Sequence, residues 1–221
     1  MMKFLRRFGD LGINGAAAQW YDENSRNHRT EEMRECAREI ASHIHDGNSV
    51  LEIAPGPGYL SIELAKLGRY EIAGLDISED FVEVARRNAK QAGVQIDFRK
   101  GNISSIPFPD DSFDFIVCTA AFKNFKEPLK ALCEMYRALK PSATAMIVDM
   151  NRSSSNRDLE ALTQGVKGFD ALFLKLSFKY FLRKGAYTKA EMVDIASKTQ
   201  FKGYDIKETE LRFSLTSKRD H

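Results

Sequence analysis

Two acidic residues and two glycines, all at the ends of apolar segments, are the residues of this chain best suited to hold a ligand. An apolar run containing Glu52 leads into a turn with Gly56 and Gly58, and a second apolar run ends at Asp76. The two glycines have no Cβ, so the chain can turn tightly there and a ligand can lie against the backbone. The next stretch, 59–67, has helical apolar spacing and would present free N–H groups to that ligand. Asp76 is placed where a doubly wound sheet positions the acid that binds a ribose diol, so the pattern predicts a cofactor containing a nucleoside.

The residues around the turn favour one class of cofactor over another. A dinucleotide fingerprint needs a third glycine to seat a pyrophosphate, and that position is Ser61. The Glu52 carboxylate would repel a pyrophosphate but would suit a cationic amine or sulfonium. S-adenosylmethionine carries both cations and is the expected cofactor, with an NAD-dependent reductase as the alternative enzyme class.

Five segments in register resemble the class I S-adenosylmethionine-dependent methyltransferases, and more closely their small-molecule branch that includes the ubiquinone and menaquinone biosynthesis type. They lie between residues 48 and 152 and comprise 51–58, 74–78, Gly101-Asn102 with Pro107-Phe108, 113–117 and 134–141. The resemblance implies an α/β, Rossmann-like, seven-stranded and mostly parallel sheet with helices on both faces and an antiparallel final strand. It also implies in-line transfer of a methyl group from S-adenosyl-L-methionine to a small molecule, which leaves S-adenosyl-L-homocysteine.

The resemblance assigns a set of residues to the cofactor. They are Tyr21, Glu52, Ala54, Pro55, Gly56, Gly58, Asp76, Ile77, Gly101, Asn102, Ile103 and Thr119. Asp76 would hold the ribose, Glu52 and the lid residue Tyr21 the methionine end, and a side chain added at Gly58 would fill the cofactor's space.

Several of these residues also have a purely structural interpretation. Glu52 could be an ordinary strand-end carboxylate, and Asp76 an acid at a helix N-terminus. Asn102 could form an Asx turn, and Tyr21, with Trp20, could simply pin the N-terminus to the core.

The chain departs from the family pattern at two turns. The first glycine of the family turn is Ala54, which is tolerated if this residue keeps an extended φ. The family's Lys-Pro-Gly-Gly turn is Lys140-Pro141-Ser142-Ala143, so a residue that tolerates positive φ is lost before a strand, which affects the turn rather than the cofactor.

No catalytic residue can be assigned. A methyl group on a sulfonium is already activated, so an enzyme chiefly aligns the acceptor and excludes water. Phe122 and Lys123 stand where relatives often carry a histidine, and they become substrate candidates. Cys118 is interpreted as a small buried residue, and His43 and His45 as exposed helix-end residues without metal-ligand spacing, so no metal is expected.

The periodicity predicts one domain of alternating strands and helices. An N-terminal cover helix is expected to begin near Thr30, and the repeated βα units imply a parallel sheet with right-handed crossovers. The expected organisation is an N-terminal cover or lid over 1–47, a cofactor core over 48–152, a substrate-lid insertion over 153–187, and a C-terminal helix and hairpin over 188–221.

The segment 169–184 has an apolar stripe with a basic stripe opposite. This pattern is typical of a core helix, of a lid over a hydrophobic substrate, or of a helix that contacts a membrane surface. The lid interpretation makes Phe173 and Phe178 substrate candidates and predicts a lipophilic or aromatic acceptor.

Composition narrows the remaining possibilities. The 33 basic and 31 acidic residues of the 221 are well mixed, which gives no sign of a nucleic-acid surface. Three unpaired cysteines, no signal-like start and no long apolar span favour a cytoplasmic protein without stable membrane insertion. The oligomeric state is open. A cofactor-binding regulatory subunit without turnover is the non-enzyme alternative, because the family histidine is missing.

Overall fold

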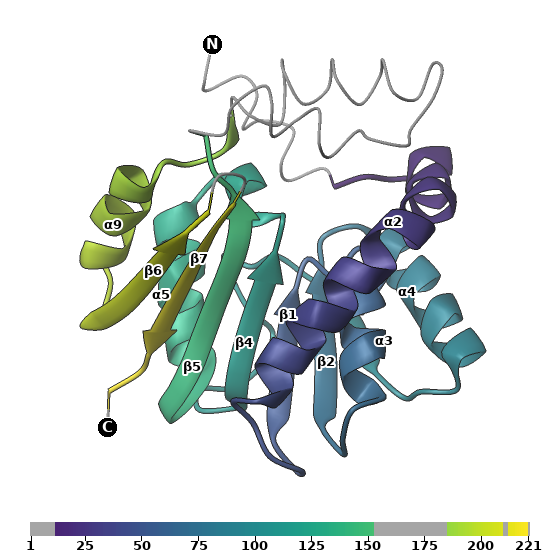
Figure 1. The fold of residues 1–221 in the computed structure, drawn as a ribbon, viewed down its shortest axis with the longest axis horizontal. Helices are drawn as coiled ribbons and strands as arrows, with labels where there is room; N and C mark the ends of the chain where they lie inside the picture. Colours follow the sequence, from purple (N-terminus) through teal and green to yellow (C-terminus); the bar gives the residue numbers. More distant parts are fainter. Residues whose placement is uncertain (1–11, 153–184, 210–211, 221) are drawn as a thin grey trace.

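A single mixed sheet forms the centre of the computed structural model, which describes residues 12–152, 185–209 and 212–220. The strand order is β3-β2-β1-β4-β5-β7-β6. The strands are β1 Ser49–Ile53, β2 Glu71–Asp76, β3 Asp97–Lys100, β4 Phe113–Thr119, β5 Leu139–Met150, β6 Gly203–Glu208 and β7 Arg212–Lys218. The first five run parallel, and β7 is antiparallel to both β5 and β6 (Figure 1). The expected fold class is confirmed.

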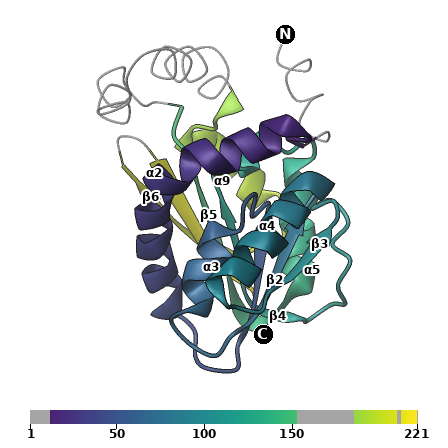
Figure 2. The ribbon, with the colours of Figure 1, turned by 90° about the vertical axis from the view of Figure 1, so that its right-hand side faces the viewer.

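Helices cover both faces of the sheet (Figures 1 and 2). One face carries α2 Ala16–Ala41, α3 Tyr59–Ala65 and α4 Glu79–Ala92, and the other carries α5 Pro128–Ala138 and α9 Lys189–Ser197. The chain leaves β1 toward β2 on one side and reaches β4 on the other, so the order reverses between β1 and β4. A parallel sheet binds its ligand outside the carboxyl ends of the strands at such a reversal.

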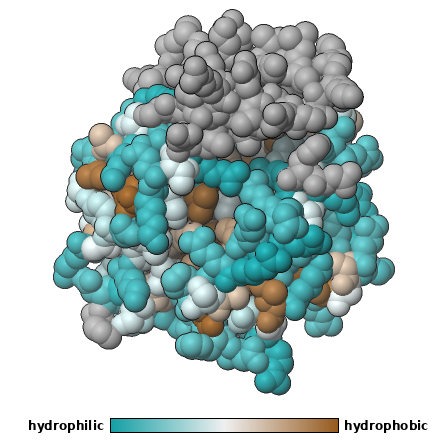
Figure 3. Space-filling model, viewed as in Figure 1, coloured by the Kyte–Doolittle hydropathy of each residue, from teal (hydrophilic) through white to brown (hydrophobic). Residues whose placement is uncertain are grey.

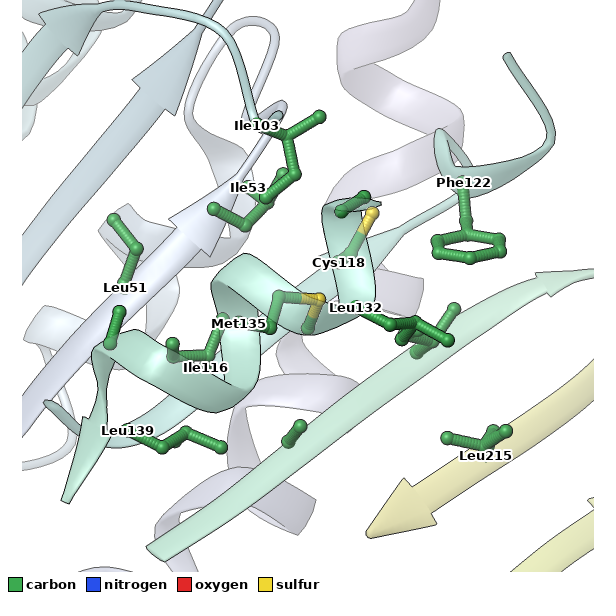
Figure 4. Close-up of a cluster of buried hydrophobic side chains, with 14 of the residues drawn as sticks. Leu51, Ile53, Ile103, Ile116, Cys118, Phe122, Leu132, Met135, Leu139 and Leu215 are labelled. Carbon is green, nitrogen blue, oxygen red and sulfur yellow. The ribbon is translucent and has the colours of Figure 1, made fainter. Parts of the chain in front are cut away.

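Alternate strand residues supply the two cores. On the α5 face, Leu51, Ile116 and Cys118 pack against Leu132 and Met135 of α5 (Figure 4). On the other face, strand and helix side chains form a second cluster around the second half of α2, namely Met33, Ala37, Ile40, Ile44, Val50, Tyr59, Leu60, Leu64, Ile72, Phe115, Val117 and Met146. Glu52 shares a strand face with Val50 and lies two residues nearer the carboxyl end, so it enters the apolar layer as a buried carboxylate.

Helix α2 begins at Ala16 rather than near Thr30, so the expected start of the cover helix was wrong. The Thr30 hydroxyl donates to the carbonyl of Arg26 instead of capping a helix. The side chains of Asn24 and Ser25 likewise donate hydrogen bonds to the main-chain carbonyls four residues earlier. Such bonds bend helices, and Figure 2 shows α2 changing direction part-way along its length. Its first half therefore runs in a different direction from the half that packs on the sheet.

The segment that corresponds to the family's Lys-Pro-Gly-Gly turn forms an irregular stretch within strand β5. Strand β5 starts directly after α5, and its pairing with β4 shifts between Phe113 and Phe115. Ser142 lies in the interrupted stretch with a φ of +65°. The positive φ of the family turn is therefore kept without the glycine, and the loss affects neither the strand nor the carboxyl edge of the sheet.

Candidate cofactor site

The turn between β1 and α3 holds three residues in left-handed conformations. Ala54 and Gly56 both have a φ of +54°, and Gly58, which caps α3, has a φ of +81°. The expectation of an extended Ala54 was wrong. An L-residue pays about 1–2 kcal/mol for this conformation, so the surrounding contacts must hold the turn in place.

The two glycines of the turn have different roles. A Cβ at Gly58 would lie 2.8 Å from the Phe98 ring and 3.1 Å from Cβ of Ala85, whereas a Cβ at Gly56 would meet nothing within 4 Å. Gly58 therefore permits close packing of the turn on α4 and β3, and it does not point into cofactor space as expected from sequence. Gly56 is the glycine with open space beside it.

Asp76 closes the turn from the end of β2. Its Oδ2 accepts the Gly56 N–H at 3.0 Å and its Oδ1 accepts the Ser78 N–H at 2.9 Å. Burial raises the pKa of Asp76 and these backbone bonds oppose the rise. A carboxylate offers about four acceptor sites, so Asp76 can fix the turn and still accept a hydroxyl group.

Glu52 is a buried carboxylate held by the next helix. Its Oε2 accepts the Ser61 N–H at 3.0 Å and the Ser61 hydroxyl at 2.5 Å. Burial raises the pKa of Glu52 to about 7, although the Ser61 bonds and the charge of Arg29 lower it and the charge of Asp76 raises it further. Ser61, the residue that replaces the third dinucleotide glycine, therefore orients Glu52. Two buried carboxylates at neighbouring strand ends favour a cationic ligand over a pyrophosphate.

The first half of α2 brings Tyr21 and Arg29 to this region. The Tyr21 ring packs edge-on against Phe81 of α4 with 5.7 Å between centroids, and Arg29 donates to the Tyr21 hydroxyl at 3.3 Å. Trp20 is 46% exposed, so it does not pin the N-terminus to the core. Arg29 follows Tyr21 by two turns of helix, and sequence reasoning gave it no role.

The segment after β3 contains three of the expected cofactor residues. Gly101 is packed against Leu75, where an added Cβ would lie 2.6 Å from Cδ1, and Ile103 is buried in the core. Asn102 is exposed and forms the alternative Asx turn, with its Oδ1 accepting the Ser104 N–H at 2.8 Å. Ile77 lies beside the N-terminal segment, because a Cβ at Gly12 would lie 3.1 Å from its Cγ2.

The segment after β4 is fixed by a buried ion pair. Lys123 Nζ lies 2.9 Å from Asp149 Oδ1 and also donates to the Ala120 carbonyl, while the Lys123 N–H donates to Asp149 Oδ2 at 2.9 Å. The two side chains are 4% and 1% exposed. Ala120 has a φ of +56°, and Thr119 before it is half-buried.

The same packing argues against Phe122 and Lys123 as substrate contacts. Phe122 is fully buried, with ring centroids 5.4 Å from Phe125 and 5.7 Å from Tyr187. Both substrate candidates are buried, because the short 3₁₀ helix 122–124 turns their side chains into the protein. The other substrate candidates, Phe173 and Phe178, lie outside the described residues.

The remaining reactive side chains have structural environments. Cys118 is buried, and burial raises its pKa. His43 is exposed and stacks on Phe115. Within 12–152, 185–209 and 212–220, no group of three or more His, Cys, Asp or Glu side chains could hold a metal ion.

An open groove of about 640 Å³ lies at the opposite edge of the sheet. It is lined at the amino ends of the strands by residues including Ser49, Glu71, Asp97 and Phe113. None of its lining residues belongs to the glycine turn, so it is separate from the candidate site.

Comparison with known proteins finds similarity over the core of the chain. Residues 51–147 match the family model described as a methyltransferase domain. A ubiquinone/menaquinone biosynthesis C-methyltransferase, UbiE, of Marinomonas sp. is 31% identical over 118 residues, which cover 52% of this chain and 47% of that protein. A Bacillus subtilis methyltransferase of uncharacterised function, YcgJ, is 38% identical over 101 residues, which cover 45% and 40% of the two chains. The chain thus spans less than half the length of these relatives.

Solved structures share the whole fold. A Methanococcus maripaludis protein proposed to be an S-adenosyl-L-methionine-dependent methyltransferase superposes with a TM-score of 0.79 at 22% identity, covering 93% of each chain. A SAM-dependent methyltransferase from Aquifex aeolicus gives a TM-score of 0.63 at 19% identity, covering 86% of this chain and 97% of the other.

The strand order of this protein is that of the class I S-adenosylmethionine-dependent methyltransferase fold, and its residues 51–147 match the methyltransferase domain model. Its homology to the UbiE type is distant. These similarities favour S-adenosyl-L-methionine over NAD as the cofactor. None of the helices that the structure describes is long and apolar enough to cross a membrane.

Proposed function

We propose that this protein transfers a methyl group from S-adenosyl-L-methionine to a small lipophilic or aromatic acceptor. The single observation that carries the cofactor half of the proposal is the pair of buried carboxylates, Glu52 and Asp76, on either side of a left-handed glycine turn. The cofactor supplies a methyl group already activated by its sulfonium charge.

The proposal gives separate roles to the acids. Asp76 accepts the ribose hydroxyls while its bond to Gly56 keeps the turn closed. The Oε1 atom of Glu52 has no hydrogen-bond partner among the described residues. This atom accepts a hydrogen bond from the ammonium group at the methionine end of the cofactor. Gly56, Ala54 and Pro55 form the backbone surface under the cofactor.

The other proposed cofactor residues surround this centre. Tyr21 covers the methionine end from α2, and Thr119 lines it at the end of β4. Ile77, Gly101, Asn102 and Ile103 form the nucleoside side, and Gly58 acts through packing. No side chain is assigned as a general base, since alignment and exclusion of water suffice for an activated methyl group.

The acceptor half of the proposal rests on sequence and on relatives. The segment 153–187 is proposed as a substrate lid, with Phe173 and Phe178 contacting the acceptor in a mostly apolar pocket. Several relatives are named as demethylmenaquinone methyltransferases, including one from Deinococcus radiodurans at 33% identity over 106 residues. A quinone-like acceptor fits the apolar stripe of 169–184.

Product identification tests the acceptor. The protein is incubated with S-adenosylmethionine carrying a deuterated methyl group and a cell-extract metabolite pool, and products gaining the labelled methyl are found by mass spectrometry. We expect a lipophilic or aromatic product, and Phe173→Ala/Phe178→Ala should raise the KM for that acceptor more than the KM for the cofactor. A small charged product, or a rise in the cofactor KM alone, would refute the lid. Cofactor binding without labelled product from any pool would favour the regulatory-subunit alternative.

A further inference from the structure

Asp22, in the first half of α2, is a buried carboxylate that collects donors from three helices. It is 2% exposed. Its Oδ1 accepts the Tyr59 hydroxyl at 2.6 Å and Asn88 Nδ2 at 3.0 Å, and its Oδ2 accepts Arg26 and Arg87, each at 3.0 Å. Burial alone would raise the pKa of Asp22, but the bonds from Tyr59, Asn88 and Arg26 outweigh it and the pKa is lowered. The group is therefore an anion at neutral pH.

Two of these donors, Tyr59 and Asn88, connect Asp22 to the glycine turn on either side of Gly58. Tyr59 is the first residue of α3, immediately after Gly58, and its hydroxyl also lies 2.8 Å from the main-chain oxygen of Asp22. Asn88 uses its amide nitrogen a second time, to donate to the carbonyl of Pro57 at 3.0 Å. Asp22 is thus linked to the residues before and after Gly58.

The turn needs such an anchor because its conformation is strained. Ala54 has a φ of +54° without being glycine, and strained residues persist only where their surroundings fix them. Asp76 holds Gly56 at the strand end, and the Asp22 cluster holds the Pro57 to Tyr59 side. The same cluster ties the first half of α2, which carries Tyr21, to α3 and α4.

We propose that Asp22 and Asn88 are positioning residues that hold the glycine turn and the first half of α2 in the shape that binds the cofactor. This inference rests on the cofactor role proposed above. Cofactor affinity then depends on Asp22 through Tyr59, Asn88 and the turn.

Asp114 provides a matched control. Its Oδ2 also accepts several donors, from the Ser49 N–H and hydroxyl at 2.9 Å each and from Lys140 Nζ at 2.7 Å. It lies in β4 beside the amino end of β1, at the other edge of the sheet. Asp114→Asn therefore disturbs a carboxylate network without touching the glycine turn.

The test compares Asp22→Asn and Asp114→Asn, each studied at the same interval below its own Tm. Hydrogen exchange of the amides in 54–62 reports on the turn, and calorimetry gives the Kd for S-adenosylhomocysteine. For Asp22→Asn we expect exchange faster and binding weaker by about tenfold or more, as the loss of hydrogen bonds to a charged group predicts. For Asp114→Asn we expect changes within about twofold.

An Asp22→Asn protein that matches the control in either measurement would overturn the proposal. If Asp22→Asn does not fold, Tyr59→Phe, which removes one hydroxyl donor, is judged by the same comparison with Asp114→Asn. A wild-type protein that binds no S-adenosylhomocysteine would refute the cofactor role itself, and the exchange rates would then show separately whether Asp22 holds the turn.

Discussion

Glu52 and Asp76 are both acids at strand ends, but their partners give them different properties. Asp76 accepts two backbone N–H groups that belong to the turn and to the start of α4. Glu52 accepts both of its bonds from Ser61 and shares its face of the sheet with the apolar residues of the second cluster. The backbone bonds of Asp76 give it a structural role beside the binding role proposed for it, whereas Glu52 is costly to bury unless a cation or a proton accompanies it.

Cofactor affinity should depend on pH through Glu52. Its pKa in the free protein is about 7 because of burial, and a bound ammonium or sulfonium would lower it. Binding below this pH must therefore release a proton, so the Kd for S-adenosylhomocysteine should fall as pH rises toward 7 and level off above it. Calorimetry at pH 6 in two buffers of different ionisation enthalpy measures the proton release.

The control for this prediction is Glu52→Gln, which has no titrating proton. It should bind more weakly at pH 8 and show no pH dependence through this range. A wild-type Kd that stays constant from pH 5.5 to pH 8.5 would show that Glu52 does not face the cation.

At the scale of elements, the glycine turn and the segment after β4 carry the strain of the site. Both end a parallel strand at the carboxyl edge, and each places an alanine at positive φ, Ala54 and Ala120. Each is held by a buried carboxylate from a neighbouring element, Asp76 for the first and Asp149 for the second.

Substitutions at the two glycines should separate packing from binding. Gly58→Val meets Phe98 and must adopt a φ of +81°, so we expect a loss of about 2–5 kcal/mol of folding stability. Gly56→Ala should lower the folding stability only by the conformational cost of about 1–2 kcal/mol. Its methyl group enters the open side of the turn and should raise the Kd for S-adenosylhomocysteine. Urea unfolding and calorimetry measure the two effects. Equal stability of both variants would show that Gly58 is not a packing glycine.

Removing Asp149 from the Lys123–Asp149 pair should destabilise the fold more than removing Lys123. Asp149→Leu leaves the buried Lys123 ammonium with only the Ala120 carbonyl and the N–H groups of Lys123 and Met150 without their acceptor, which should cost about 3–5 kcal/mol. Lys123→Met leaves the carboxylate with both backbone donors, so it should cost less. Urea unfolding of the two variants gives the comparison, and a larger loss for Lys123→Met would contradict the assigned bonds.

Sequence was informative where a local pattern determines the local structure. The turn with Gly56 and Asp76 was predicted from short motifs, and the family resemblance that these motifs carry implied the seven-stranded, mostly parallel sheet with an antiparallel final strand. The start of α2 was missed because its first half depends on long-range bonds, in which the Gly15 N–H donates to Asp80 and the Asn88 amide donates to Asp22. No spacing in the sequence reveals these bonds. The Lys123–Asp149 pair joins residues 26 apart in sequence, and only the adjacency of β4 and β5 brings them together.

At the scale of the whole molecule, one sheet places every proposed cofactor residue at one edge. The carboxyl ends of β1, β2, β3 and β4 and the first half of α2 meet there (Figures 1 and 2). The face seen in Figure 3 is mainly hydrophilic with scattered hydrophobic residues, as expected for a domain whose apolar side chains are gathered in the two cores.

The most direct measurement of the central claim is calorimetry of the wild-type protein with S-adenosylhomocysteine and with NAD, repeated with Asp76→Ala. We expect binding of S-adenosylhomocysteine at one site and no heat with NAD. Asp76→Ala should weaken the binding of S-adenosylhomocysteine by about 1–3 kcal/mol, because charge-assisted hydrogen bonds to the ribose are lost. Tight binding of NAD with no heat from S-adenosylhomocysteine would contradict the account, and an unchanged Kd in a folded Asp76→Ala protein would remove Asp76 from the site.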